Sequence, residues 1–415
     1  MGNIINHSVV RQCFSFISKR SIRFPLADRR IQKLTTERCI KLLVGAQLFK
    51  WESLREIACR LATSRPLQKI VGLSTISHSQ ISRRLQDLPT DLLENMLLTL
   101  TRKVHQEAGP AVKSNLNLSI IDSTYLQLPK QLSAWAHLGK KTTQMKVHMQ
   151  VSALASGSCL PGRVIPSTAN VSDSEVMGLL VQGQDGTVYI MDRGYIQYKQ
   201  FDAWIQDKVS FVTRLTKRNG IREVVEEREI PENSRTTRDA VVRLGSDFVE
   251  MEHPVRLVEF TDTQGRHYRL VSSCLQLTAE EISDIYRRRW LIELYFKWIK
   301  QHLQLKKLFS YDPRGLWNQI FISLIAYSIS MLIYIRSQTQ LPHWELLRAL
   351  RVCWEKDVRV MHQLLHPTMS KTSKGRQKRP KEEEKVTHFP VGVGIVKPVS
   401  SNKHPRRRDR KKKVK

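Results

Sequence analysis

Four polar residues late in the chain follow each other at helical spacing: Tyr286, Arg289, Glu293 and Lys300. At about 100° per residue they share one face of a helix, and Lys297 lies beside them. Such a row can be a solvated face on which oppositely charged neighbours pair. It can also be a carboxylate that binds a metal ion and is flanked by groups that bind phosphate. The spacing alone leaves both interpretations open.

Two aspartates supply further carboxylates at the predicted ends of strands. Asp122 ends an apolar, β-branched run over residues 116–122, and Asp192 ends a second run over residues 186–192. Sites of α/β folds lie at the carboxyl ends of strands, although a single strand-end aspartate is often only a turn residue. Together with Glu293, the two aspartates suit paired Mg²⁺ ions, which prefer hard oxygen ligands. Two such ions, about 4 Å apart, can activate a water and stabilise the leaving oxygen in phosphodiester displacement.

The elements that would position these groups follow from the same sequence. Residues 278–308 contain no Gly or Pro, and Thr278 with Glu281 forms a capping-box start, so one continuous helix is predicted. An apolar run at 316–335 is nearly long enough to cross a membrane. Its Asn, Gln and Ser residues favour a buried core helix instead. A further helix is predicted at 343–365.

The middle of the chain predicts an α/β fold with a mixed sheet. Residues 111–215 alternate strands and helices. The strands are predicted at 116–122, 145–155, 159–169, 186–192 and 210–215. The helices are predicted at 172–180 and 198–207. Residues 216–276 alternate short strands with turn signals. They predict a β-rich insertion between the last strand of the sheet and the long helix, which opens the segment 277–365.

The N-terminal segment, residues 1–110, is predicted to be all-helical. Helical apolar spacing predicts helices at residues 35–49 and 52–62. A Pro-containing loop follows, and a third helix at 80–88 is predicted to be capped by Ser79. Arg83 and Arg84 are predicted on the polar side of the last helix. The two later helices resemble a helix-turn-helix, or they belong to an ordinary helical bundle; the sequence favours neither.

Composition indicates a polyanionic partner. The formal net charge is +30 and the isoelectric point about 10.1, so nucleic acid is the expected partner. Residues 367–415 hold 17 basic and 4 acidic residues, so the rest of the chain is basic as well. The tail, residues 366–415, has little to bury and is predicted to be disordered. The six cysteines have no metal-ligand or redox spacing, which indicates free thiols in a reducing cytosol.

The motifs together resemble a known family. The signature Tyr, two residues, Arg, three residues, Glu, six residues, Lys is met without a gap by the four residues of the helical row. Ile-Asp-Ser-Thr around Asp122 and Asp-Arg-Gly-Tyr from Asp192 resemble two other acidic blocks. Over residues 115–335 the chain resembles a DDE transposase of the insertion-sequence-four family, in its Tyr-Arg-Glu-Lys signature subgroup, encoded by bacterial insertion elements.

The resemblance implies an RNase H-like catalytic core and a cut-and-paste transposition reaction. Asp122, Asp192 and Glu293 would be the catalytic residues and would bind two Mg²⁺ ions, for which Mn²⁺ can substitute. Candidate contacts to DNA are Tyr286, Arg289, Lys300, Lys297, Arg83 and Arg84. A homodimer would nick the inverted-repeat ends of the element and join the freed 3′-hydroxyl to target DNA. The expected location is the bacterial cytoplasm, with no membrane. The alternatives are an RNase H-like nuclease without strand transfer and a catalytically decayed DNA-binding relative.

One departure from the family concerns aromatic residues. Some relatives use a tryptophan in the β-rich insertion to stack a base that flips out while a DNA hairpin forms. Residues 216–276 contain no Trp, although Phe248, Phe260 and Tyr268 are present. Trp290, inside the signature, is predicted to pack the helix. The use of a hairpin intermediate therefore stays open.

Overall fold

The computed structural model describes residues 8–17, 28–108, 116–129, 137–138, 143–154, 156–216, 218–303 and 307–367. The predicted disordered tail lies outside the described residues from 368 onward. The strands are β1 (Asn117–Leu128), β2 (His137–Leu138), β3 (Thr143–Ala153), β4 (Cys159–Thr168), β5 (Thr187–Met191), β6 (Ser210–Arg214), β7 (Ile221–Glu227), β8 (Thr236–Leu244), β9 (Val255–Thr261) and β10 (His267–Ser272). The helices are α1 (Val9–Ser15), α2 (Thr36–Phe49), α3 (Leu54–Thr63), α4 (Arg65–Val71), α5 (His78–Asp87), α6 (Thr90–Ala108), α7 (Asp173–Leu180), α8 (Tyr198–Gln206), α9 (Ala279–Arg287), α10 (Trp290–His302), α11 (Pro313–Ser337), α12 (His343–Cys353) and α13 (Val358–Leu365), with a 3₁₀ turn η2 (Arg193–Tyr195).

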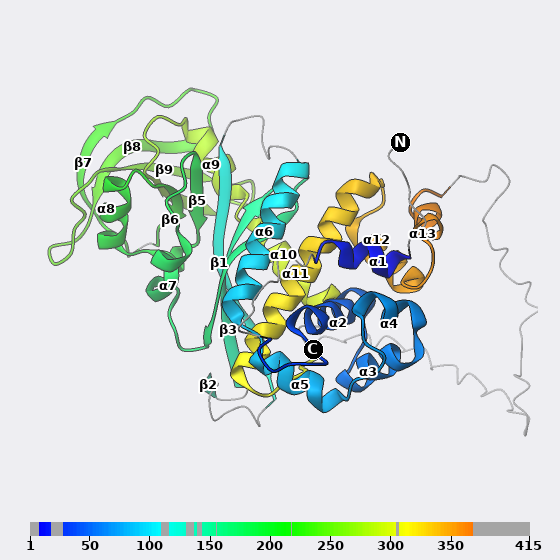
Figure 1. Cartoon of the computed structure of the whole chain (residues 1–415). Coiled ribbons are helices and arrows are strands. Elements are labelled where there is room, and N and C mark those ends of the chain that lie inside the picture. Colours follow the sequence, from blue (N-terminus) through cyan, green and yellow to red (C-terminus); the bar gives the residue numbers. More distant parts are fainter. Residues whose placement is uncertain are drawn as a thin grey trace, which may run out of the picture. The chain divides into compact units, whose positions relative to one another are not determined.

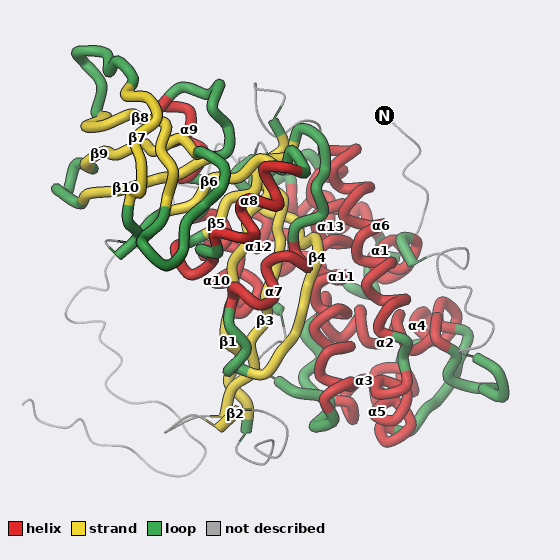
Figure 2. The backbone as a smooth tube through the Cα atoms, turned by 90° about the vertical axis from the view of Figure 1, so that its left-hand side faces the viewer, coloured by secondary structure: helices red, strands yellow, loops and turns green. Residues whose placement is uncertain are grey.

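The ten strands of the described residues join one mixed sheet (Figures 1 and 2). Their order is β2-β3-β1-β5-β6-β10-β9-β8-β7, with β4 paired to β3. β1, β5 and β6 are parallel to one another, and the remaining pairs are antiparallel. The predicted insertion strands β7 to β10 are present, and β10 pairs with β6, so the insertion extends the central sheet.

The two faces of the sheet carry separate hydrophobic cores. Side chains alternate along a strand, so Ile120 packs into one core and its neighbour Ile121 into the other. The first core contains residues of α6, α10 and α11. The second lies under α7 and α8, where Phe201 and Phe211 stack with ring centroids 4.6 Å apart. The predicted helices at 172–180 and 198–207 are thus confirmed and cover one face.

β1 is longer than predicted. At Asp122 only its pairing with β5 ends, whereas the strand itself continues. Parallel pairing of β1 with β5 stops at Ile121 opposite Met191. Antiparallel pairing with β3 continues to Leu128, which is buried. The backbone groups beyond Asp122 therefore keep hydrogen-bond partners, and the chain stays extended.

The N-terminal helices confirm the all-helical prediction for the described residues, with two corrections. The predicted Pro-containing loop holds α4, in which Pro66 occupies the first turn, where its missing N–H is not needed. The cap of α5 is Ser77 and not Ser79. The Ser77 hydroxyl accepts from the Gln80 N–H, and the Gln80 side chain returns to the Ser77 backbone.

The apolar run at 316–335 forms α11, which is a core helix, as predicted. α11 lies beside α6 in both views (Figures 1 and 2) and also contacts α2, α5 and β4. Among the described residues it alone is long and apolar enough to cross a membrane, but 78% of its apolar window is buried in the protein. Its polar Asn318 is satisfied inside the core, where its side-chain N–H groups donate to the carbonyls of Leu85 and Leu88.

The predicted long helix at 278–308 is wrong as one element, although its Thr278–Glu281 capping box is present. α9 ends at Arg287 and α10 begins at Trp290. Between them the N–H groups of Arg288 and Arg289 donate to carbonyls three residues back. α9 packs on β6, β8, β9 and β10, whereas α10 packs on β1 and β4. Because the strands of a sheet are twisted relative to one another, one straight helix cannot follow both regions.

The predicted helix at 343–365 is likewise two helices, α12 and α13. Asp357 caps α13 by accepting from the Arg359 N–H at 2.8 Å, and it also bridges to Ser8. The carbonyl of Lys356 accepts from the Val9 N–H at 2.9 Å. The residues between α12 and α13 therefore bind the backbone at the start of α1 and do not continue the helix.

Candidate active site

The three predicted carboxylates come from three elements that meet near one point of the sheet. Asp122 and Asp192 directly follow Ile121 and Met191, the last parallel pair of β1 and β5. Glu293 lies in the first turn of α10, and α10 packs against β1. Asp122 and Glu293 are 171 positions apart in sequence, and both contact the guanidinium of one arginine.

That guanidinium belongs to Arg289, the residue before α10. One of its terminal nitrogens lies 3.3 Å from the Asp122 carboxylate, and the other lies 2.5 Å from Glu293. The Arg289 side chain is 16% exposed. Burial lowers the pKa of Arg289, but the hydrogen bond to Glu293 and the charges of Asp192 and Asp122 raise it more, so the net shift is upward. Arg289 therefore forms the helix-spaced pair with Glu293 that one interpretation of the row expected, but its side chain lies largely out of solvent.

Asp122 is electrostatically perturbed. Burial raises the pKa of its carboxyl to about 6, and the nearby charges of Asp192 and Asp173 act in the same direction. The Ser123 N–H, which donates to Asp122 at 2.7 Å, and the Arg289 charge act against this rise. A carboxylate with a raised pKa among like charges is typical of a functional site.

The site fits divalent cations by the chemistry of its donors. All three acids are carboxylates, the ligand type that Mg²⁺ prefers, and a positive charge already lies among them. Within the described part of the chain, no three acidic, imidazole or thiol groups are close enough as they stand to share one ion. The Arg289 guanidinium contacts both Asp122 and Glu293, so binding of a metal ion by these two acids would require it to move away from them.

The other residues of the predicted helical face divide between the interior and solvent. Tyr286 is buried, and burial together with the charge of Asp192 raises the pKa of its phenol. The Lys300 ammonium lies 2.5 Å from the Thr124 hydroxyl, two residues after Asp122 on β1. Lys297 is exposed. Arg289 and Lys300 therefore both reach across to β1, on the two sides of Glu293.

The two N-terminal candidates differ. Arg83 is exposed, as predicted. Arg84 is only 7% exposed, and its guanidinium lies 2.6 Å from both the Asp28 carboxylate and the Thr36 hydroxyl. Its predicted place on the polar side of the helix is therefore wrong, and Arg84 stabilises the packing of α5 on the segment before α2.

A cavity of about 870 Å³ opens beside Asp192, between α9 and the insertion strands. Trp290 lines it and is 56% exposed, so the prediction that this indole packs the helix is wrong. Phe260 and Tyr268 also line it and stack at 5.0 Å, and the Arg214 guanidinium lies 4.2 Å from the Tyr268 ring centre. Aromatic and cationic groups therefore line the cavity.

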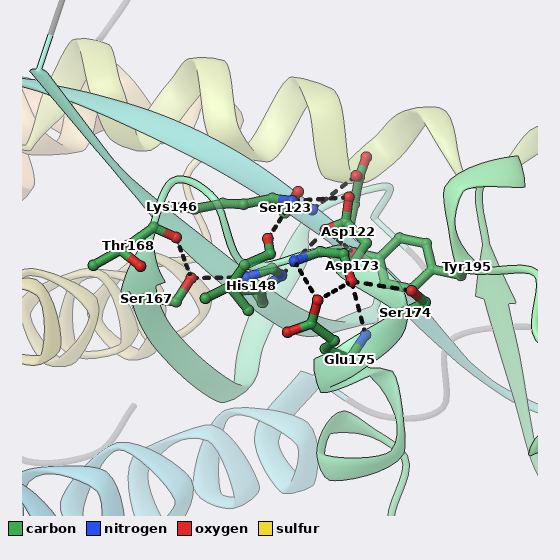
Figure 3. Close-up of polar contacts among 12 residues, drawn as sticks. Asp122, Ser123, Lys146, His148, Ser167, Thr168, Asp173, Ser174, Glu175 and Tyr195 are labelled. Carbon is green, nitrogen blue, oxygen red and sulfur yellow. Dashed lines mark hydrogen bonds and ion pairs between the residues drawn. The ribbon is translucent and has the colours of Figure 1, made fainter. Parts of the chain in front are cut away.

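Sequence reasoning missed a group of polar residues behind Asp122, drawn in Figure 3. Asp173 begins α7 and lies 3.0 Å from the Lys146 ammonium and 3.1 Å from the His148 ring. The hydroxyl of Tyr195 donates to Asp173 at 3.2 Å. Tyr195 belongs to the Asp-Arg-Gly-Tyr block, which is the one signal in the sequence that could have pointed to this group.

The family of this chain follows from comparison with known proteins. A family model described as "Transposase DDE domain" matches residues 113–329, slightly more than half of the chain. The "Probable transposase for insertion sequence element IS5377" of Geobacillus stearothermophilus is 25% identical over 74% of this chain and 78% of its own length. The protein y4zB of Sinorhizobium fredii, named as a transposase, is 32% identical over 51% of this chain and 59% of its own length. A solved piggyBac transposase synaptic complex with hairpin DNA covers 86% of this chain and 82% of its own, at 15% identity and a TM-score of 0.40.

The family match covers β1, the end of β5 and α10, the three elements that carry the carboxylates. The mixed sheet with helices on both faces, together with this match, confirms the predicted RNase H-like α/β fold. The narrower assignment to the Tyr-Arg-Glu-Lys subgroup stays a prediction. The chain belongs to the DDE transposase family and is an enzyme that acts on DNA.

Proposed function

We propose that this enzyme cuts DNA at the inverted-repeat ends of an insertion sequence and joins the freed 3′ ends to target DNA in a cut-and-paste reaction. The observation that supports this most is the convergence of Asp122, Asp192 and Glu293 around the Arg289 guanidinium. Asp122 from β1 and Glu293 from α10 contact this one guanidinium, and the charge of Asp192 at the end of β5 acts on it. The family's need for divalent metal agrees with this donor set.

The three carboxylates would hold two Mg²⁺ or Mn²⁺ ions. Bound there, such ions supply activation of a water or 3′-hydroxyl and stabilisation of the leaving oxygen. If the two carboxylates held metal, Arg289 would lose these partners, and its planar guanidinium would be free to bind a DNA phosphate through two donors. Lys300, which contacts Thr124 of β1, and exposed Lys297 would bind neighbouring phosphates of the same strand.

The cavity beside Asp192 is proposed to receive a base unstacked from the DNA end. Trp290 offers an exposed aromatic face, and stacking of bases on such a face tolerates any sequence. Arg214, over the Tyr268 ring, adds positive charge for the adjoining phosphate. This arrangement is compatible with a hairpin step even though the insertion has no tryptophan.

Recognition of the element end is proposed to involve the N-terminal helices, with exposed Arg83 of α5 as one contact. The first turn of α5, residues 78–80, is also exposed and polar. Synapsis of two ends would require a homodimer, and the bacterial cytoplasm would be the compartment. The predicted segment boundaries at 110, 215, 276 and 365 also remain proposals.

A nicking and joining assay on a labelled end duplex with a supercoiled target tests the proposal. Asp122→Asn, Asp192→Asn and Glu293→Gln should each abolish cleavage and joining and keep gel-shift affinity for the end, because each removes a metal ligand. Asp185→Asn, at an exposed position before β5, is the matched loss of charge and should behave as wild type.

Two outcomes separate the alternatives. Cleavage by the wild type without joining would identify a nuclease without strand transfer. End binding without cleavage in either Mg²⁺ or Mn²⁺ would identify a decayed DNA-binding relative. Normal cleavage by any of the three variants would show that the triad is misassigned.

A further inference from the structure

Asp173 is a fourth carboxylate beside the catalytic acids, and its oxygens are already occupied. One oxygen lies 3.0 Å from the Lys146 ammonium. The other lies 3.1 Å from His148 Nδ1 and accepts from the Tyr195 hydroxyl at 3.2 Å (Figure 3). Burial raises the pKa of Asp173, but the hydrogen bonds from His148, Ser123 and Lys146 outweigh it and lower the pKa strongly. Asp173 is therefore an anion held by neighbours and is not available as a metal ligand.

The partners of Asp173 are fixed by burial. His148 is completely buried, and its Nε2 lies 2.9 Å from the Ser167 hydroxyl on β4, so its ring is held from both sides. Lys146 is also buried and donates to the carbonyl of Val171 at 3.2 Å. Buried charged groups that are fully paired hold one geometry, because any other leaves a charge without a partner.

This group is connected to both catalytic aspartates. The Ser123 hydroxyl hydrogen-bonds to Asp173, and the Ser123 N–H donates to the Asp122 carboxylate at 2.7 Å. Tyr195 ends η2, the turn that begins beside Asp192, whose carboxylate accepts from the Arg193 N–H at 2.7 Å. Asp173 thus reaches the residue after Asp122 and the third residue after Asp192.

We infer that Asp173, held by Lys146, His148 and Tyr195, is a positioning residue that sets the relative orientation of Asp122 and Asp192 for metal binding. This inference rests on the proposed metal-dependent function. Residues that orient metal ligands are needed for metal affinity and activity, and their loss typically costs about 10–100-fold. A purely structural group would instead change folding stability and leave metal affinity as it is.

The test measures Mn²⁺ binding to the DNA-free protein by electron paramagnetic resonance. Tyr195→Phe removes only the hydroxyl that binds Asp173, and Asp173→Asn removes the charge. Both should weaken Mn²⁺ binding by about 10–100-fold and leave end affinity in gel shifts within about twofold. Cleavage should need more Mn²⁺ and recover at saturating Mn²⁺. The matched control is Tyr189→Phe, a buried tyrosine whose hydroxyl accepts from the N–H groups of Gln182 and Gln184.

The outcomes distinguish this inference from the function on which it rests. Wild-type Mn²⁺ affinity in Tyr195→Phe, together with lost binding in Asp122→Asn, would overturn the positioning role alone. Equal loss of affinity in Tyr195→Phe and Tyr189→Phe would also overturn it, because the effect would then be general softening of the core. Wild-type Mn²⁺ affinity in Asp122→Asn would overturn both the proposed function and the inference.

Discussion

Asp122 should destabilise the metal-free protein, and Asp122→Asn should reverse this. Burial and neighbouring acids raise the pKa of Asp122 from 3.8 to about 6, with the attraction of Arg289 already included. The rise corresponds to about 3 kcal/mol of unfolding free energy, at about 1.4 kcal/mol for each tenfold change in proton affinity. Asparagine resembles the protonated acid in size and charge. Above pH 6 and in EDTA, we therefore expect the variant to be more stable than wild type by about 3 kcal/mol.

The pH dependence gives the sign of the effect. The folded state keeps the Asp122 proton up to about pH 6, whereas the unfolded state releases it near 3.8. This carboxyl's contribution to stability is therefore complete below about pH 4 and is lost as the pH rises to 6. The difference between Asp122→Asn and wild type should grow over that interval and then stay constant.

Urea denaturation in EDTA from pH 4 to 8 measures this difference in unfolding free energy. In a parallel series without EDTA, Mg²⁺ should stabilise only the wild type, since a ligand stabilises the state that binds it. Asp185→Asn, at an exposed position, controls for the change in net charge. A variant that is less stable than wild type in EDTA at pH 7.5 would refute the reasoning. It would mean that the pairing of Asp122 with Arg289 outweighs the cost of burying the carboxylate.

Arg289→Ala should lower stability in EDTA by about 3 kcal/mol, because Asp122 and Glu293 lose their shared cation, and divalent metal should restore most of the loss; calorimetry with and without Mg²⁺ measures both. Arg84→Ala should lower the free energy of unfolding by about 3 kcal/mol in urea denaturation, because it breaks a buried ion pair. Exposed Arg83→Ala should change it by less than about 0.5 kcal/mol and reduce the salt dependence of end binding in gel shifts. Trp290→Ala should slow second-strand cleavage about tenfold in a gel assay without lowering stability, because an exposed ring that stacks a base contributes to DNA binding and not to the core. Deletion of residues 398–415 should weaken non-specific DNA binding and its salt dependence, while cleavage at saturating end DNA persists.

Features that depend on nearby residues were determined by the sequence alone. The Thr278–Glu281 capping box forms as predicted, because each partner reaches the other within one helical turn. The strands of the insertion also follow from their alternation and turn residues. The resemblance of the complete signature, from Tyr286 to Lys300, and of the two acidic blocks around Asp122 and Asp192 to the family was enough to predict it.

Exposure was decided by the tertiary structure. Arg83 and Arg84 are adjacent in sequence and about 100° apart on α5, yet only Arg84 meets Asp28 in the interior. Trp290 has the composition of a core residue, but the break between α9 and α10 turns it into the cavity beside Asp192. Helical periodicity identifies a face, whereas long-range packing decides whether that face meets solvent or another element.

The electrostatics of the site were decided in the same way. The raised pKa of Asp122, the pairing of Arg289 with two acids and the Asp173 group all join residues from different elements. His148 and Lys146 look like ordinary polar residues of a strand until β4 and α7 cover them. Burial and charge proximity depend on distances in space, and a single sequence records only distances along the chain. The three acids could therefore be proposed as catalytic from the sequence, whereas the group around Asp173 could not be found from it.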